Sequence, residues 1–200
     1  MKKMQDQQIY EVNPHTMIIL PYKAGGSLYS EVMELGSHSI SKFTPFELIK
    51  TSCKYFGANY DGRKEGTKHL IGITHKPPII IDPISFTYAF PTTSPQNPHC
   101  VWIFPQHIKD YQSADNNQTF IRFANLETVV LDISISSFNN QIARTSMLHM
   151  KFSQKMRKIE SQIPQTSMFF PPSNYVAESF LGYRRTPSNN NQPPDDPPRK

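Results

Sequence analysis

The sequence contains little cysteine. Only Cys53 and Cys100 occur among its 200 residues, and they form no Cys-x-x-Cys motif. Secreted domains held together by disulfides are rich in cysteine, so this composition excludes a disulfide scaffold and indicates a reducing compartment. Cys53 falls on the apolar face of a predicted helix, where an unpaired cysteine usually serves as core packing.

Long apolar runs are absent as well. The longest, such as residues 17–20 and 129–131, are far shorter than the roughly 20 apolar residues of a membrane-spanning helix. The N-terminal residues MKKMQDQQIYEV include two lysines but lack the apolar stretch of a secretory signal. We therefore expect a cytoplasmic protein that does not engage a membrane.

Signatures of catalysis and of metal binding are missing too. The chain has no G-x-S-x-G, Walker A or G-x-G-x-x-G motif. His69 with His75, and His99 and Cys100 with His107, match no known zinc spacing, and an adjacent His–Cys pair is not a catalytic geometry. An enzyme acting through Cys100 and His99 is the least favoured reading. The sequence predicts no enzyme, no metal site and no cofactor.

Positive charge is the feature that the chain does have. The formal net charge is +5, and residues 50–76 contain six Lys or Arg against two acids. A basic surface attracts a polyanion, either a nucleic acid or an acidic protein. The sequence therefore favours a binding protein.

Two helices are predicted from local signals. Thr44-Pro45-Phe46-Glu47 is a capping box with proline at the first helical position, and Gly57 supplies a stop after Phe56. A second helix is expected to begin near Ser137 and to end before Pro164. Its predicted buried stripe consists of Phe138, Ile142, Leu148, Phe152, Met156 and Ile159.

The rest of the chain is predicted to be mostly strand. Residues 115–118 (DNNQ) form a turn between two extended segments, and residues 57–68 are interpreted as a glycine-rich basic turn. The fold class that follows is α+β, mainly antiparallel, with two or three helices and no helix-turn-helix. The expected strands are 17–20, 28–35, 69–74, 78–81, 86–90, 101–104, 119–123 and 128–133.

The cations form two groups that are candidates for DNA binding. One group lies in the basic segment around residues 50–76, and the other lies along one face of the second helix, where Lys155 and Lys158 continue the stripe. Arg63 and Lys64 are expected to enter a narrow, negative minor groove. The alternative is a solvated turn and a wet helix face whose cations serve solubility. The predicted DNA-binding residues are Arg63, Lys64, Lys68, Lys76, Lys54, Arg144 and Lys151.

Several short motifs resemble the ComK family of competence transcription factors. The resemblance runs in order from about Tyr10 to about Phe170. The motifs are SCKYFG at 52–57, YDGRKEGT at 60–67, HKPPI at 75–79, DP at 82–83, FPT at 90–92, CVWI at 100–103, SSFNNQ at 136–141 and RT at 144–145.

The resemblance implies a cytoplasmic, nucleoid-associated activator of DNA-uptake genes that acts without a helix-turn-helix. Members bind paired A/T-rich boxes of double-stranded DNA, largely through the minor groove, as dimers that associate into tetramers. The alternative, from another class, is a cytoplasmic interaction protein that binds an acidic protein partner through its basic surface. Steep salt dependence of DNA retention would favour the activator.

The family also implies a C-terminal handle for the adaptor of a regulated protease. The equivalent residues are Met168, Phe169, Phe170 and Pro171, although Ser167 and Pro172 depart from the family pattern. We expect a flexible N-terminus (1–9), a DNA-binding domain (10–160), the handle segment (161–185) and a disordered, Pro- and Asn-rich tail (186–200).

Overall fold

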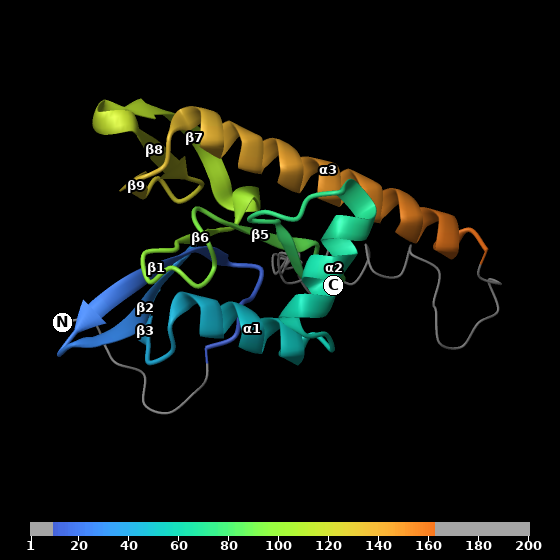
Figure 1. Cartoon of the computed structure of the whole chain (residues 1–200), viewed down its shortest axis with the longest axis horizontal. Helices are drawn as coiled ribbons and strands as arrows, with labels where there is room; N and C mark the ends of the chain where they lie inside the picture. Colours follow the sequence, from blue (N-terminus) through green and yellow to red (C-terminus); the bar gives the residue numbers. More distant parts are fainter. Residues whose placement is uncertain (1–9, 163–200) are drawn as a thin grey trace, which may run out of the picture. The chain divides into compact units, whose positions relative to one another are not determined.

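The computed structural model describes residues 10–162 (Figure 1). The chain divides into two compact units, Met1–Met156 and Arg157–Lys200, and of the second only residues 157–162 are described. The predicted tail and the predicted adaptor residues 168–171 lie outside the described residues. None of the described helices is long and apolar enough to span a membrane.

A six-stranded antiparallel sheet forms the centre of the first unit. Its strand order is β3-β2-β1-β6-β5-β4. The chain therefore enters at the central strand β1 and runs outward to the edge strand β3. It begins again at the opposite edge with β4 and returns to the middle through β6, which pairs with β1 and β5. Most of these strands were predicted, but β3 was not, because its polar residues carry little strand signal. The strands are β1 (Thr16–Ala24), β2 (Ser27–Glu34), β3 (His38–Ser41), β4 (Ile79–Asp82), β5 (Thr87–Pro91) and β6 (Trp102–Ile103).

A three-stranded antiparallel sheet follows, in the order β7-β8-β9. Its strands are β7 (Ile108–Ala114), β8 (Gln118–Phe123) and β9 (Thr128–Leu131), and a short 3-10 turn, η1 (Pro105–His107), leads into β7. The predicted turn near residues 115–118 is confirmed as η2 (Asp115–Asn117), which joins β7 to β8.

Helix α1 (Pro45–Tyr55) has both of its predicted ends. Thr44 Oγ1 accepts from the Glu47 backbone N–H at 3.3 Å, and the Glu47 carboxylate accepts from the Thr44 N–H at 2.9 Å. Gly57 has a φ of +74°, which favours glycine, and its N–H and that of Ala58 donate to the Lys54 and Cys53 carbonyls. The capping box and the glycine stop are therefore confirmed.

Helix α2 (Tyr60–Ile71) corrects two predictions. Residues 57–68 are not a turn and residues 69–74 are not a strand, because one helix covers residues 60–68 of the first range and 69–71 of the second. Asn59 caps it by accepting from the Gly62 N–H at 2.6 Å, and a Cβ on Gly62 would lie only 3.0 Å from that side-chain oxygen. Gly72, at φ +74°, ends it. Glycines 62 and 66 lower the helix propensity, but tertiary packing of Tyr60 and Thr67 overrides it.

Helix α3 (Ile135–Glu160) follows β9. Ser134 caps it by accepting from the Ser137 N–H at 3.3 Å. Phe138 and Leu148 are buried as predicted, and Phe152 packs on the third core cluster described below. The prediction that Ile159 is buried is wrong, since its side chain is 50 % exposed. The contacts of α3 with the core clusters end at Phe152.

The core lies on both faces of the six-stranded sheet. On one face α1 packs against residues such as Ile19, Ile79 and Trp102. On the other face the three-stranded sheet and the start of α3 cover residues such as Ile18, Phe90 and Ile103 (Figure 1). A third cluster joins β4 and β5 to the end of α2 and the middle of α3, through Ile80, Tyr88, Leu70, Ile71, Leu148 and Phe152.

Candidate nucleic-acid interface

One flank of α3 carries a basic stripe. Arg144, Lys151 and Lys155 are spaced by seven and four residues, which places them within about 40° of one another around the helix axis. Lys151 and Lys155 are exposed and Arg144 is half-buried. The stripe adjoins the buried face of the helix, so the third core cluster holds it in place.

The loop between α2 and β4 meets this stripe. The Arg144 guanidinium donates to the His75 carbonyl at 3.4 Å, and the Gln141 amide donates to the Lys76 carbonyl at 3.1 Å. His75 and Lys76 are both exposed. We call His75, Lys76, Arg144, Lys151 and Lys155 the basic surface.

Within residues 10–162, the basic surface is not neutralised by ion pairs. Among residues 10–162, none of its Lys and Arg side chains forms an ion pair with Asp or Glu. Cations elsewhere are partly neutralised, as in the pair of Arg122 with Asp110 at 2.6 Å. Unpaired cations from two distant segments on one side of the molecule are the electrostatic arrangement that binds a polyanion.

The remaining predicted cations lie elsewhere. Lys68, on α2, is exposed and 3.6 Å from the Glu65 carboxylate. Lys54 is exposed in the last turn of α1. Lys64 is half-buried and lines a small cavity. Of the predicted residues, Lys76, Arg144 and Lys151 thus belong to the basic surface. Within the described part of the chain, no hydrogen bond or ion pair connects Lys54, Lys64 or Lys68 to it.

The Arg63 side chain takes part in packing between two helices. Its Nη2 donates to the Phe56 carbonyl at the end of α1 at 3.2 Å, and its Nε is buried without a partner among the described residues. Arg63 therefore links α2 to the end of α1. Its removal should lower the stability of the fold, whereas a position in a solvated turn would have made it dispensable for stability.

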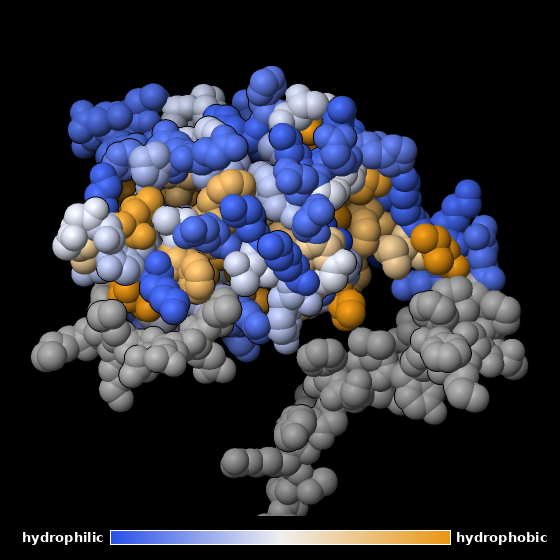
Figure 2. Space-filling model, turned by 60° about the horizontal axis from the view of Figure 1, so that its bottom comes forward, coloured by the Kyte–Doolittle hydropathy of each residue, from blue (hydrophilic) through white to orange (hydrophobic). Residues whose placement is uncertain are grey.

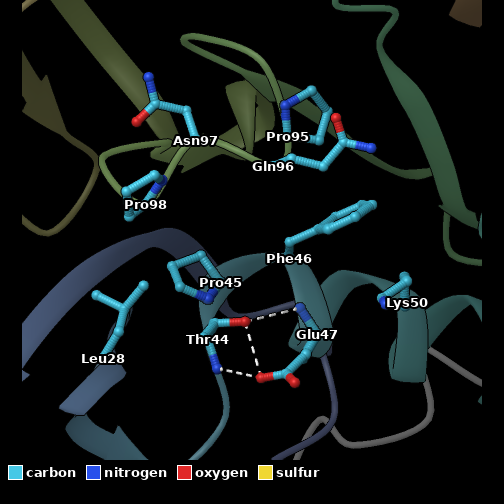
Figure 3. Close-up of a pocket in the computed structure, with 10 residues that line it drawn as sticks. All are labelled: Leu28, Thr44, Pro45, Phe46, Glu47, Lys50, Pro95, Gln96, Asn97 and Pro98. Atoms are coloured by element: carbon cyan, nitrogen blue, oxygen red, sulfur yellow. Dashed lines mark hydrogen bonds between the residues drawn. The ribbon is translucent and has the colours of Figure 1, made fainter.

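Two cavities border the loop at residues 94–98. One of about 270 Å³ lies between this loop and the start of α1, where Phe46 faces Pro95 and Gln96 (Figure 3). The other, of about 200 Å³, continues past Phe46 to Tyr60 and Lys64. Thr44 and Glu47 line the first cavity, but their side chains are engaged in the capping box of α1. Neither side chain is therefore free to act on a ligand in this cavity.

The cysteines are buried and unpaired. Cys53 lies in the core, as expected, at 0 % exposure. Burial raises the pKa of its thiol to about 11, and burial also raises the pKa of Cys100. A buried, protonated thiol is a poor nucleophile. In the part of the chain that the structure describes, no three His, Cys, Asp or Glu side chains are grouped as a metal site.

Apolar side chains do not form a broad surface on the face drawn in Figure 2. Hydrophilic residues predominate there, and apolar ones lie in small separate patches. Broad exposed apolar patches mark protein docking sites. The described residues on this face therefore give no sign of an apolar partner.

Sequence reasoning missed Gln141. It is 2 % exposed and lies on the buried face of α3, between Phe138 and Leu148. A polar residue on an apolar stripe is a detectable signal, because a buried amide needs hydrogen-bond partners. The local sequence does not predict which carbonyls the Gln141 amide binds.

The chain is similar in sequence to known proteins of one family. A family model described as "ComK protein" matches residues 7–157. The chain is 36 % identical over 160 residues to the competence transcription factor of Bacillus subtilis (strain 168), and the match covers 80 % of this chain and 82 % of that protein. No solved structure matches the chain significantly.

Proposed function

Because the chain belongs to the ComK family, we propose that it is a sequence-specific, DNA-binding transcriptional activator of competence genes. The family is one of transcription factors and not of enzymes, which agrees with the expectation from the sequence. The observation that carries the proposal for this chain is the basic surface, formed by unpaired cations from α3 and from the loop before β4.

The proposed mechanism begins with phosphate neutralisation. Each Lys or Arg that contacts a phosphate releases condensed counterions, which supplies affinity without sequence preference. From Arg144 to Lys155 the helix rises about 16 Å. One DNA strand advances about 3.4 Å along the duplex axis per phosphate, so this stripe is long enough to follow several phosphates.

We propose that the target is A/T-rich double-stranded DNA, contacted largely in the minor groove. A narrow A/T minor groove has an enhanced negative potential that attracts Arg and Lys. Within the basic surface, we propose that Lys76 and Arg144 contact the phosphates that border this groove. We propose Arg63, Lys64, Lys68 and Lys54 as weaker contacts. Arg63 is engaged with the Phe56 carbonyl, and Lys68 lies near the Glu65 carboxylate.

Self-association is part of the proposal. When one copy of a dimer binds its box, the other copy is held near the second box at a high effective concentration. The dimer therefore binds paired boxes more tightly than one copy binds a single box. We propose dimers that become tetramers on DNA, in the cytoplasm and on the nucleoid. Measuring the mass of the complex on one box and on two boxes tests the stoichiometry.

A titration of the full chain against an A/T-box duplex and a G/C duplex of equal length, at several salt concentrations, tests the function. We expect a preference for the A/T duplex. If roughly six phosphates are neutralised, the affinity should fall by a factor of tens or more between low and physiological salt. Equal affinities would refute the minor-groove mechanism. Absence of binding to both would leave an acidic protein as the partner of this surface.

A further inference from the structure

The side chain of Gln141 ties three elements together. From α3 its Nε2 donates to the Lys76 carbonyl at 3.1 Å and to the Pro91 carbonyl, at the end of β5, at 2.7 Å. These partners are 65 and 50 residues away in the sequence. The loop that carries Lys76 is therefore fixed on α3 and β5 through one amide.

Glutamine is chemically suited to this position. Its amide nitrogen has two N–H donors, one for each carbonyl, and its stem reaches from the helix. The orientation is determined, since turning the amide would place its oxygen against two acceptors. Its Oε1 is buried without a partner among the described residues. An unpaired buried acceptor is unfavourable, so an ordinary core position would favour an apolar residue.

Lys76 has a strained backbone. Its φ is +48°, in the left-handed region that favours glycine, and it precedes Pro77, which restricts its conformation further. Its side chain is nevertheless exposed. Strain of this kind persists where the surrounding structure enforces it, and it concentrates at functional positions. Here the enforcing contact is the hydrogen bond from Gln141.

Arg144 completes the arrangement. It lies three residues after Gln141, on the neighbouring part of the helix surface, and its guanidinium donates to the carbonyl of His75, the residue before Lys76. Gln141 and Arg144 thus hold consecutive carbonyls of the same loop. Two cations that are distant in the sequence are brought to one place before any ligand arrives.

We propose that Gln141 is a positioning residue that builds a preformed phosphate contact from Lys76 and Arg144. The ligand is a backbone phosphodiester of the bound DNA, so the inference rests on the proposed function. Holding the loop in its bound conformation in the free protein removes the ordering cost from the binding step. Gln141 itself does not touch the ligand.

Three variants of the full chain separate positioning from stability. Gln141→Leu keeps a similar volume and removes both donors. Lys76→Gly removes the cation and suits the left-handed φ, so the fold should hold. Thr145→Val is the matched control, because Thr145 is also buried on α3 but donates only to the Gln141 backbone carbonyl within the helix, at 2.7 Å.

The measurement is affinity for an A/T-rich duplex as a function of salt, with the melting temperature beside it. Lys76→Gly should flatten the slope of log affinity against log salt by about one unit and weaken binding roughly tenfold near 0.1 M salt. Gln141→Leu should weaken binding in the parent chain and much less in a Lys76→Gly, Arg144→Ala background. Thr145→Val should bind like the parent.

Equal losses from Gln141→Leu in both backgrounds would reduce Gln141 to a structural role and overturn the inference. If Gln141→Leu does not fold, Lys76→Gly decides, and an unchanged slope and affinity would overturn it. Salt-dependent binding by the parent, unaffected by Lys76→Gly, refutes this inference and leaves the proposed function standing. A parent chain that binds neither duplex refutes both.

Discussion

Arg63 shows how the environment of one residue decides what its charge does. Its guanidinium donates to the Phe56 carbonyl at the C-terminal end of α1. We predict that Arg63→Ala lowers the free energy of unfolding by about 1–2 kcal/mol, because it removes a charged donor from a helix end. The melting temperature should fall by several degrees. Lys68→Ala, on the same helix but exposed, should change it little. Thermal unfolding that is equal for the two variants would contradict the role of Arg63.

His107 should make stability depend on pH. It is 8 % exposed, its Nε2 donates to the Pro14 carbonyl at 2.8 Å, and burial lowers its pKa. On acidification the unfolded chain takes up a proton at this histidine first, near its ordinary pKa of about 6.5. Stability is therefore fully present above that pH and is lost as the pH falls toward the lowered pKa of the folded state.

We predict that His107→Gln, which keeps a donor but does not titrate, has a flatter stability profile in this range. Urea unfolding at about pH 7.5 and about pH 5.5 measures it. The parent and the His107→Gln variant share the other six histidines. The difference between their stability profiles therefore reports on position 107. Parallel profiles would show that His107 contributes nothing to the pH dependence.

At the scale of elements, α3 buries one face in the core and exposes lysines on another. Lys151 and Lys155 are exposed, so reversing their charge should leave the fold intact. We predict that Lys151→Glu with Lys155→Glu flattens the salt slope of DNA binding by about two units and weakens it roughly a hundredfold near 0.1 M salt. Lys109→Glu, an equal charge change per site at an exposed position of β7, is the control. If the control weakened binding as strongly, net charge rather than α3 would explain the effect.

At the scale of the whole chain, we predict that the last fifteen residues are dispensable for DNA binding. Residues 186–200 contain no large apolar side chain, so they have little to contribute to a core. A chain cut after Arg185 should melt at the parent temperature and bind the A/T duplex with parent affinity. Loss of binding on this cut would mean that the tail takes part in recognition.

The proposed adaptor handle belongs to the same scale. Met168, Phe169 and Phe170 precede two prolines, and a short apolar segment is readily bound as a peptide. We predict that replacing all three with alanine lengthens the lifetime of the protein in cells that contain the adaptor and its protease, without changing DNA affinity. Pulse-chase measurement tests this. An unchanged lifetime would mean that Ser167 and Pro172 have abolished the handle.

The sequence by itself determined the features that depend on near neighbours. The capping box at Thr44–Glu47, the stop at Gly57 and the apolar stripe of α3 as far as Phe152 are read from residues within a few positions of one another. Most strands follow from short apolar runs between turn residues, and the antiparallel class follows from the scarcity of helices between them. These signals are local because helix caps and turns satisfy backbone groups with nearby side chains.

Tertiary structure decided α2 and the basic surface. Two glycines and several charges weaken the helical pattern of residues 60–71. The helix is stabilised by packing of Tyr60 on Phe46 and Trp102 and by donation from the Thr67 hydroxyl to the Pro78 carbonyl at 2.8 Å. Arg144 meets a carbonyl 69 residues away only because α2, β4 and β5 place that loop against α3. Such contacts carry no local sequence signal, since the chain must close long loops before they can form.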